Sequence, residues 1–240
     1  MTLNRDVIKY FAMVTMLGNH VANIFMAPSL WRTILIDLGY FTAPVMCYFL
    51  VEGYHYTHSK AHYAFRLALF AALSQLPFSL AFSQGAVLSF VGMNMLYTLL
   101  ICFAILVVLE RVQQLALRMV AVLALTLLTA NADWALMAPI FTLLFSWAWG
   151  SRERLKQAFV MALVLFGFNG YVVYATYASV LASFFHALGQ MSGMALAALV
   201  LIYGYNGKRM QHGRAFSKWF FYVFYPGHLL ILGLIRLFLL

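Results

Sequence analysis

Apolar runs of about twenty residues recur along the whole chain, separated by short polar turns. A helix of about 20 apolar residues crosses about 30 Å of hydrocarbon, because each residue adds about 1.5 Å. The pattern therefore predicts an all-α fold, a polytopic transmembrane helical bundle of about nine spans. The expected spans are 7–28, 33–56, 61–82, 87–109, 113–130, 133–150, 155–176, 182–205 and 218–240.

Two parts of this pattern are weaker than the rest. The fifth and sixth expected spans are short, and Gly170, His186 and Gly189 suggest a break within 170–190. The chain shows no obvious internal repeat, which disfavours a transporter built from inverted halves.

Basic residues gather in alternate turns. They lie between spans two and three, four and five, six and seven, and eight and nine, and the last of these turns is the richest. The turns at 83–86, 131–132 and 177–181 contain none, and only Arg32 breaks the alternation. Because Lys and Arg favour cytoplasmic loops, we expect the N-terminus and the basic turns to face the cytoplasm.

The composition indicates that the chain forms one membrane domain. Of 240 residues, 65% are hydrophobic and 9% are charged, against about 25% charged residues in a soluble domain. We therefore expect 1–240 to form a single integral membrane domain in contact with the lipid bilayer. The net charge of +9 follows from the basic turns, so we expect no nucleic-acid partner. Gly18, Asn19 and His20 interrupt the first apolar run, which indicates an uncleaved span rather than a signal peptide.

Metal chemistry is not expected from the histidines and cysteines. Cys47 and Cys102 both lie in apolar runs, without the spacing of metal ligands or of a disulfide framework. His55, His58 and His62 straddle a turn and lack an accompanying carboxylate or cysteine set.

Lys9 and His20 are the first candidates for chemistry. They are eleven residues apart in the first span, so both project from one helix face, about 16 Å apart along the axis. Lys9 lies near the cytoplasmic end and His20 lies toward the outside. A neutral His in low dielectric is suited to act as a general base. The alternative is a His that packs between helices and a Lys that reaches the interface.

Further polar groups are expected at each end of the bundle. Depth counting brings Gln75, Asn94 and Asp133 into the outer half near His20, where Asn94 could orient the imidazole or bind an oxyanion. Buried amides such as these also join membrane helices.

At the inner end, Glu52 and Arg66 flank a basic turn near Lys9, a collar that would suit the phosphates of an anionic cofactor. Glu52 paired with a neighbouring base is the alternative. Tyr225, Pro226 and His228 lie in the last span, where a proline frees a carbonyl and favours polar neighbours.

These residues resemble the TraX family, whose members acetylate the N-terminus of F-type pilin, and more broadly the membrane acyltransferase superfamily. The resemblance covers nearly the full chain except about 155–205. The similar segments are 5–9 followed by 19–20, 43–45, 50–53 with 57, 66 with 74–77, 94–98, Asp133 and 221–228. Asn19 departs from the family, which often has aspartate there, and Trp134-Ala135 replaces a tyrosine–glycine step.

The resemblance implies an acetyl-CoA-dependent acetyltransferase. Acetyl-CoA would enter from the cytoplasm with its phosphates near Lys9 and Arg66, and its acetyl group would reach His20. His20 would then deprotonate an acceptor at the outer face, a pilin amine or, in related proteins, a sugar hydroxyl. Two other classes stay open: a small proton-coupled transporter using His20, Glu52 and His228 as relay groups, and a non-catalytic pilin assembly factor.

Overall fold

A computed structural model describes residues 2–85, 88–211 and 213–239. The chain folds into two compact units. Unit 1 comprises Met1–Met46 and Trp147–Arg214, and unit 2 comprises Cys47–Ser146 and Ala215–Leu240.

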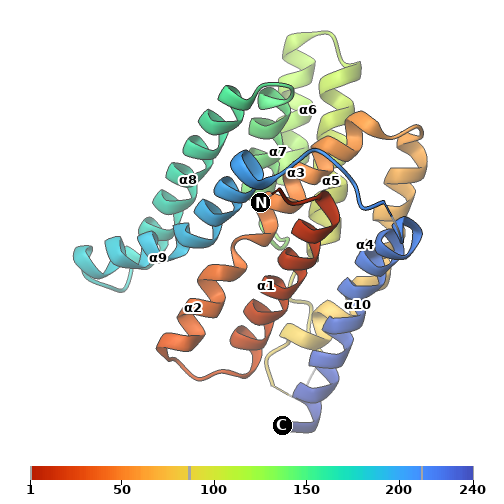
Figure 1. The fold of residues 1–240 in the computed structure, drawn as a ribbon. Helices are drawn as coiled ribbons and strands as arrows, with labels where there is room; N and C mark the ends of the chain where they lie inside the picture. Colours follow the sequence, from red (N-terminus) through yellow and green to blue (C-terminus); the bar gives the residue numbers. More distant parts are fainter. Residues whose placement is uncertain (1, 86–87, 212, 240) are drawn as a thin grey trace. The chain divides into compact units, whose positions relative to one another are not determined.

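Unit 1 is built from two helical hairpins. α1 (Arg5–Phe25) and α2 (Leu30–Gly39) are joined by a short turn and pack against each other. α8 (Arg152–Ala175) and α9 (Val180–Leu199) form the second hairpin, and α9 also packs against α2. α9 continues into the π-helical turn η1 (Val200–Gly204). Figure 1 shows both hairpins, α1–α2 in red to orange and α8–α9 in green to blue.

Unit 2 contains most of α3 (Thr42–Tyr56) together with α4 (Lys60–Phe82), α5 (Met95–Arg111), α6 (Leu115–Leu127), α7 (Met137–Ala148) and α10 (Arg214–Leu239). α4 and α10 run side by side in the same direction. The Phe70 ring stacks on Tyr222 with centroids 4.8 Å apart, and Gly233 lies against Leu80 and Ala81 eleven residues further along both helices.

The expected membrane architecture is confirmed. Among the residues that the structure describes, five helical segments are long and apolar enough to cross a membrane: Leu30–Tyr56, Lys60–Phe82, Arg152–Ala175, Val180–Gly204 and Trp219–Leu239. Each of the nine expected spans contains at least one helix. The described residues include no strand, only two isolated bridges. The protein is therefore an all-α, multi-pass membrane protein.

The short fifth and sixth spans also appear as expected, as α6 of 13 residues and α7 of 12. The expected break within 170–190 falls at 176–179, whereas Gly170 and Gly189 lie inside helices. The fourth span begins later than expected, at Met95, because Asn94 caps α5. Its Oδ1 accepts from the main-chain N–H groups of Leu96 and Tyr97, at 3.0 and 3.3 Å, which satisfies two of the unpaired donors that start a helix.

The side chain of Arg236, in the last turn of α10, forms hydrogen bonds at the C-terminal end of α4. Its Nε donates to the carbonyl of Leu80 at 3.0 Å, and its Nη1 donates to those of Ser83 and Gly85 at 2.7 and 2.8 Å. These carbonyls lie in the last turn of α4 and in the three residues after it, where carbonyls lack helical N–H partners. A cation is also favourable there because of the helix dipole. A costly charge in an apolar segment thus has a structural role.

Candidate functional site

Lys9 and His20 lie on one unbroken helix, α1, as the sequence predicts. His20 is 8% exposed and shares the buried face of α1 with Ala12 and Met16. Lys9 is half-buried one turn from the N-terminus of that helix. Asn4 fixes the start of the helix, because its side chain accepts from the Val7 N–H at 3.0 Å.

The middle of α1 is tied to the start of α3. The Thr42 hydroxyl donates to the Ala12 carbonyl at 2.8 Å, and the Thr15 hydroxyl donates to the same carbonyl at 3.0 Å. The two hydroxyl oxygens are 3.2 Å apart. These contacts lie between Lys9 and His20 along α1 and support the helix over the length that separates them.

The residue before His20 sets the register between α1 and α2. The Asn19 Nδ2 donates to the main-chain carbonyl of Ile36 at 3.0 Å. A Cβ added to Gly39 would lie 2.3 Å from the Asn19 Cβ, so the absence of a side chain at Gly39 permits the contact. Asn23 donates to Asn19 Oδ1 at 3.0 Å. His20 therefore lies at the depth of residues 35–36 of α2.

An acidic residue that was not among the expected site residues lies next to Ile36 in α2. Asp37 of α2 is 9% exposed, and its Oδ2 is 2.7 Å from the place where a Cβ on Gly189 would lie. No hydrogen bond or ion pair to the Asp37 carboxylate occurs among the residues that the structure describes. Its signal in the sequence was plain: ionisable groups in apolar runs need a function or a partner, and Asp37 lies inside one.

At the other end of α1, a basic loop is fastened to the start of the helix. The Leu3 N–H donates to the Gly204 carbonyl at 2.7 Å, and the Arg5 N–H donates to the Lys208 carbonyl at 2.9 Å. The Met210 N–H donates to the Asp6 carboxylate at 2.7 Å. The most basic of the expected cytoplasmic turns is thus held within one turn of α1 from Lys9.

In unit 2, the half-buried Gln75 and the buried Asn94 form one amide network. Asn94 is fully buried, and its Nδ2 donates to the Ala71 carbonyl at 2.7 Å and to Gln75 Oε1 at 2.9 Å. Gln75 Nε2 donates to the Gly92 carbonyl at 2.7 Å. The network joins α4 to the start of α5, as buried amides often join membrane helices.

Tyr225 and Asp133 lie around the same end of α5. The Tyr225 hydroxyl accepts from the Met95 N–H at 3.1 Å. Asp133 lies in the loop before α7, where its N–H donates to the Met93 carbonyl at 2.7 Å and its carbonyl accepts from the Thr98 hydroxyl at 2.7 Å. Next to Asp133, Trp134 and Leu136 adopt positive φ angles of 57° and 58°, which non-glycine residues rarely do.

His228 lies one helical turn after Phe224 in α10. Its Nδ1 and the Phe224 carbonyl are 2.8 Å apart, so Nδ1 carries the proton in this contact. Its ring stacks on that of Phe224 with centroids 4.8 Å apart and meets the Tyr225 ring edge-on at 5.7 Å. Tyr225 and His228 are therefore in direct ring contact on α10.

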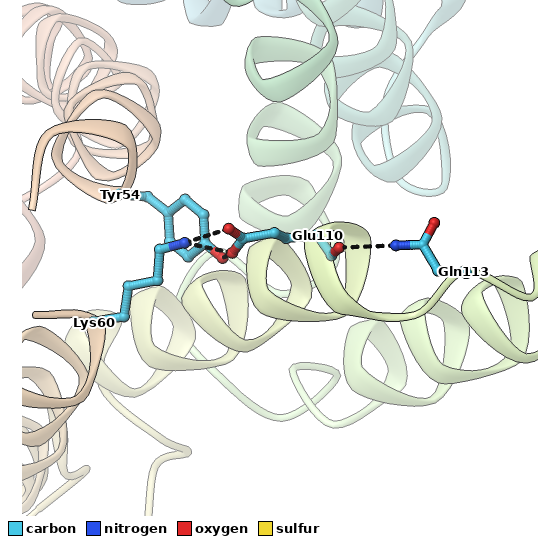
Figure 2. Close-up of polar contacts among 4 residues, drawn as sticks. All are labelled: Tyr54, Lys60, Glu110 and Gln113. Carbon is cyan, nitrogen blue, oxygen red and sulfur yellow. Dashed lines mark hydrogen bonds and ion pairs between the residues drawn. The ribbon is translucent and has the colours of Figure 1, made fainter.

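The end of α3, the start of α4 and the end of α5 hold charged groups. Glu52 is buried in α3, and the Arg66 guanidinium lies 5.6 Å from the centre of the Tyr63 ring. Lys60 donates to Glu110 Oε1 at 2.6 Å, and the Tyr54 hydroxyl also donates to the Glu110 carboxylate. Figure 2 shows the Lys60 ammonium and the Tyr54 ring meeting at this carboxylate, with Gln113 reaching the Glu110 carbonyl. The hydrogen bond from Lys60 holds the pKa of Glu110, outside the expected span 87–109, below its usual value.

The site residues expected from the sequence thus fall into two sets. Unit 1 contains Lys9 and His20, and unit 2 contains Glu52, Arg66, Gln75, Asn94, Asp133, Tyr225 and His228. The structure brings Gln75 together with Asn94, and Tyr225 together with His228. The expected approach of Gln75, Asn94 and Asp133 to His20, and of Arg66 to Lys9, stays a prediction. No group of three or more metal-binding side chains occurs among the described residues.

Comparison with known proteins decides the family. The TraX protein family matches residues 4–236. The chain belongs to the TraX family.

A named relative of this TraX-family chain comes from a pilus system. The chain is 28% identical over 240 residues to the probable fimbrial assembly protein FimC, serogroup H1, of Dichelobacter nodosus. The alignment covers 97% of this chain and 95% of the relative. No solved structure matches significantly. The TraX-family membership and this relative together make the chain a pilus-related membrane protein.

The structure explains an asparagine at position 19, where the TraX family often has aspartate. Its Nδ2 donates to the Ile36 carbonyl, a bond that an aspartate carboxylate could not make because it has no N–H to donate. Asn19 therefore connects α1 to α2 beside His20.

Proposed function

We propose that this TraX-family protein is a bacterial inner-membrane acetyltransferase. It takes the acetyl group of cytoplasmic acetyl-CoA and transfers it to an extracytoplasmic acceptor, the N-terminal amine of a pilin. His20 acts as the general base, and Lys9 binds the cofactor's phosphates. The observation that carries the proposal is the single helix α1, on which a half-buried Lys9 and a buried His20 lie eleven residues apart, about 16 Å along the axis.

The proposed chemistry is acyl transfer. The acceptor nitrogen attacks the thioester carbonyl carbon, and His20 takes the proton that the nitrogen loses. A C–N bond forms, the C–S bond breaks, and the departing thiolate of CoA takes a proton. The buried face of α1 supports this role for His20, because a low dielectric favours its neutral, proton-accepting form.

Lys9 and the loop fastened beside it support cofactor binding from the cytoplasm. The contacts of Leu3, Arg5 and Asp6 with residues 204–210 keep Lys208 and Arg209 close to the start of α1. Ammonium and guanidinium groups bind phosphate well. Arg66 and Glu52 are also proposed to bind the cofactor, and Asn94 and Asp133 are proposed to act in catalysis. The pilin acceptor draws support from the fimbrial relative.

The test uses purified protein in detergent. Acetyl-CoA binding is measured by calorimetry for the native protein and for Lys9→Ala and His20→Ala, and acetyl transfer to a peptide amine is measured by mass spectrometry. We expect Lys9→Ala to lose binding and His20→Ala to keep binding but lose transfer. Lys156→Ala is the matched control, because Lys156 is paired with Glu153 at 2.7 Å on an exposed surface of unit 1. Folded native protein that binds no acetyl-CoA, or transfer that survives His20→Ala, would contradict the proposal.

A further inference from the structure

Asp37 is a charged group in an unusual position. It lies in Leu30–Tyr56, one of the segments apolar enough to cross a membrane, and is only 9% exposed. Its carboxylate has no hydrogen bond or ion pair among the residues that the structure describes. Leaving a charge buried and unpaired is costly, so such a residue in a membrane segment generally serves a binding or transport function.

The surroundings of Asp37 are built to admit its side chain. α9 presents Gly189 and Gly193 to α2 at this point. A Cβ on Gly189 would lie 2.7 Å from Asp37 Oδ2, and one on Gly193 would lie 2.2 Å from the Asp37 carbonyl oxygen. Any larger residue at either position would displace the carboxylate or α2 itself.

Asp37 and His20 flank one hydrogen-bonded pair of the α1–α2 hairpin. Asn19 donates to the Ile36 carbonyl at 3.0 Å, and His20 and Asp37 each follow one member of this pair. Because the two helices are antiparallel, the two residues are offset by about 3 Å along the hairpin axis. In the expected orientation, the turn that joins α1 to α2 faces outward, so both side chains lie on the side from which an acceptor would arrive.

From these observations we propose that the Asp37 carboxylate binds the cationic amine of the acceptor. The inference rests on the proposed acetyl transfer, and it names the residue that recognises the acceptor amine. An α-amine has a pKa of about 7.7–8.0 in water, so it arrives largely as an ammonium ion. The Asp37 carboxylate can accept a charge-assisted hydrogen bond from this ammonium ion. A neutral sugar hydroxyl would form a weaker hydrogen bond with the same carboxylate. Asp37 is a recognition residue in this proposal, and His20 keeps the role of base.

The first measurement is acceptor binding without acetyl-CoA. Calorimetry in detergent compares a short apolar peptide bearing a free N-terminal amine with its N-acetylated form and with its N-terminal hydroxy-acid analogue. We expect the native protein to bind the free amine roughly tenfold or more tightly than either analogue, and Asp37→Asn to lose this preference. Equal binding of all three peptides by the native protein, or an unchanged preference in Asp37→Asn, would overturn the proposal.

A second variant guards against misfolding of Asp37→Asn. Gly189→Ala keeps the Asp37 carboxylate but adds a methyl group 2.7 Å from its Oδ2. Because the carboxylate must then move, we expect a weaker preference for the free amine. Gly18→Ala is the control, because its Cβ would meet only Leu35 at an ordinary 3.4 Å. If Gly189→Ala folds and keeps the full preference, the carboxylate does not bind the amine.

The outcomes separate this inference from the proposed function. If amine binding depends on Asp37 but the protein forms no acetylated product, the role of Asp37 in binding the amine stands and the proposed acetyl transfer is ruled out. If Asp37→Asn forms product with an unchanged KM for the amine peptide, the proposed acetyl transfer stands and the role of Asp37 in binding the amine is ruled out.

Discussion

The side-chain amide of Asn19 donates to the main-chain carbonyl of Ile36 across 3.0 Å and thereby caps the end of a neighbouring helix. Ile36 lies in the last turn of α2, where carbonyls lack helical partners. The Tyr40 N–H bonds to the Asp37 carbonyl at 3.2 Å and the Phe41 N–H bonds to that of Leu38 at 3.1 Å. The Asn19 contact therefore satisfies a carbonyl at the end of α2 and joins α2 to α1 beside His20.

Replacing Asn19 should loosen this hairpin. In Asn19→Ala the Ile36 carbonyl loses its donor, and leaving a buried acceptor unpaired costs about 1–3 kcal/mol. Asn19→Asp should cost at least as much, because a carboxylate cannot donate to the carbonyl. Thermal unfolding in detergent measures both, with Asn4→Asp as a control that keeps an acceptor for the Val7 N–H. If Asn19→Ala left the unfolding temperature unchanged, the contact between Asn19 and Ile36 would stabilise neither helix.

Gly193→Ala should disrupt unit 1 more strongly than any other glycine substitution in α9. Its Cβ would lie 2.2 Å from the Asp37 carbonyl oxygen and 2.8 Å from the Phe41 nitrogen. Both are main-chain atoms, so α2 and α9 must separate. We expect a loss of about 2 kcal/mol or more in the free energy of unfolding.

Gly227→Ala is the matched control for Gly193→Ala. A Cβ at Gly227 of α10 would meet nothing within 4 Å, and alanine is favoured over glycine in a helix by about 1 kcal/mol. We therefore expect Gly227→Ala to raise the unfolding temperature slightly. A Gly193→Ala protein as stable as Gly227→Ala would contradict the close packing of α2 on α9.

Much of the fold could be predicted because membranes impose a length on apolar runs. Lys9 and His20 fall on one helix as their spacing requires. The boundary at Asn94 was harder, since an apolar run at 87–93 continues the hydropathy of the span, and only the bonds to Leu96 and Tyr97 identify the residue as a cap. The roles of the site residues stay predictions.

Other features depend on contacts between distant parts of the chain, which hydropathy does not report. The loop at 204–210 is bound to the start of α1 through the N–H groups of Leu3 and Arg5, and main-chain pairing of this kind leaves little trace in residue type. Asp37 is different. Its charge was visible in the sequence, but its place against Gly189 follows only from the packing of α2 on α9.

The Lys60–Glu110 pair should make stability depend on pH in the acidic range. Because the hydrogen bond from Lys60 lowers the pKa of Glu110 from 4.5, the folded protein prefers the charged carboxylate. This stabilisation is present above pH 4.5 and is lost as the pH falls through the lowered pKa of the folded state.

Glu110→Gln measures this contribution. We expect the difference in unfolding temperature between the native protein and Glu110→Gln to shrink as the pH falls below 4.5, and to shrink at high salt because the pair is partly exposed. Glu153→Gln is a suitable comparison, since its pair with Lys156 lies on an exposed helix surface. A difference that stays constant from pH 7 to pH 3 would rule out the charged pair as its source.

Substitutions at Asn94 should separate a structural role from a catalytic one. Its Oδ1 caps α5, and its Nδ2 donates to Ala71 and Gln75 at 2.7 and 2.9 Å, so both amide hydrogens are engaged. Asn94→Ser keeps a capping oxygen and loses the amide, whereas Asn94→Ala loses both. We expect Asn94→Ala to be less stable than Asn94→Ser by about 1 kcal/mol, the usual contribution of a cap.

The turnover of folded Asn94→Ser then decides between the two roles. An amide that holds α4 to α5 affects stability, so kcat per folded molecule should fall by less than about tenfold. An amide that stabilises the oxyanion would have to exchange its bonds to Ala71 and Gln75 during the reaction, and its loss would lower kcat by about 100-fold or more. Comparison of kcat with the folded fraction, measured on the same sample, distinguishes a helix cap from a group that acts on the acetyl carbonyl.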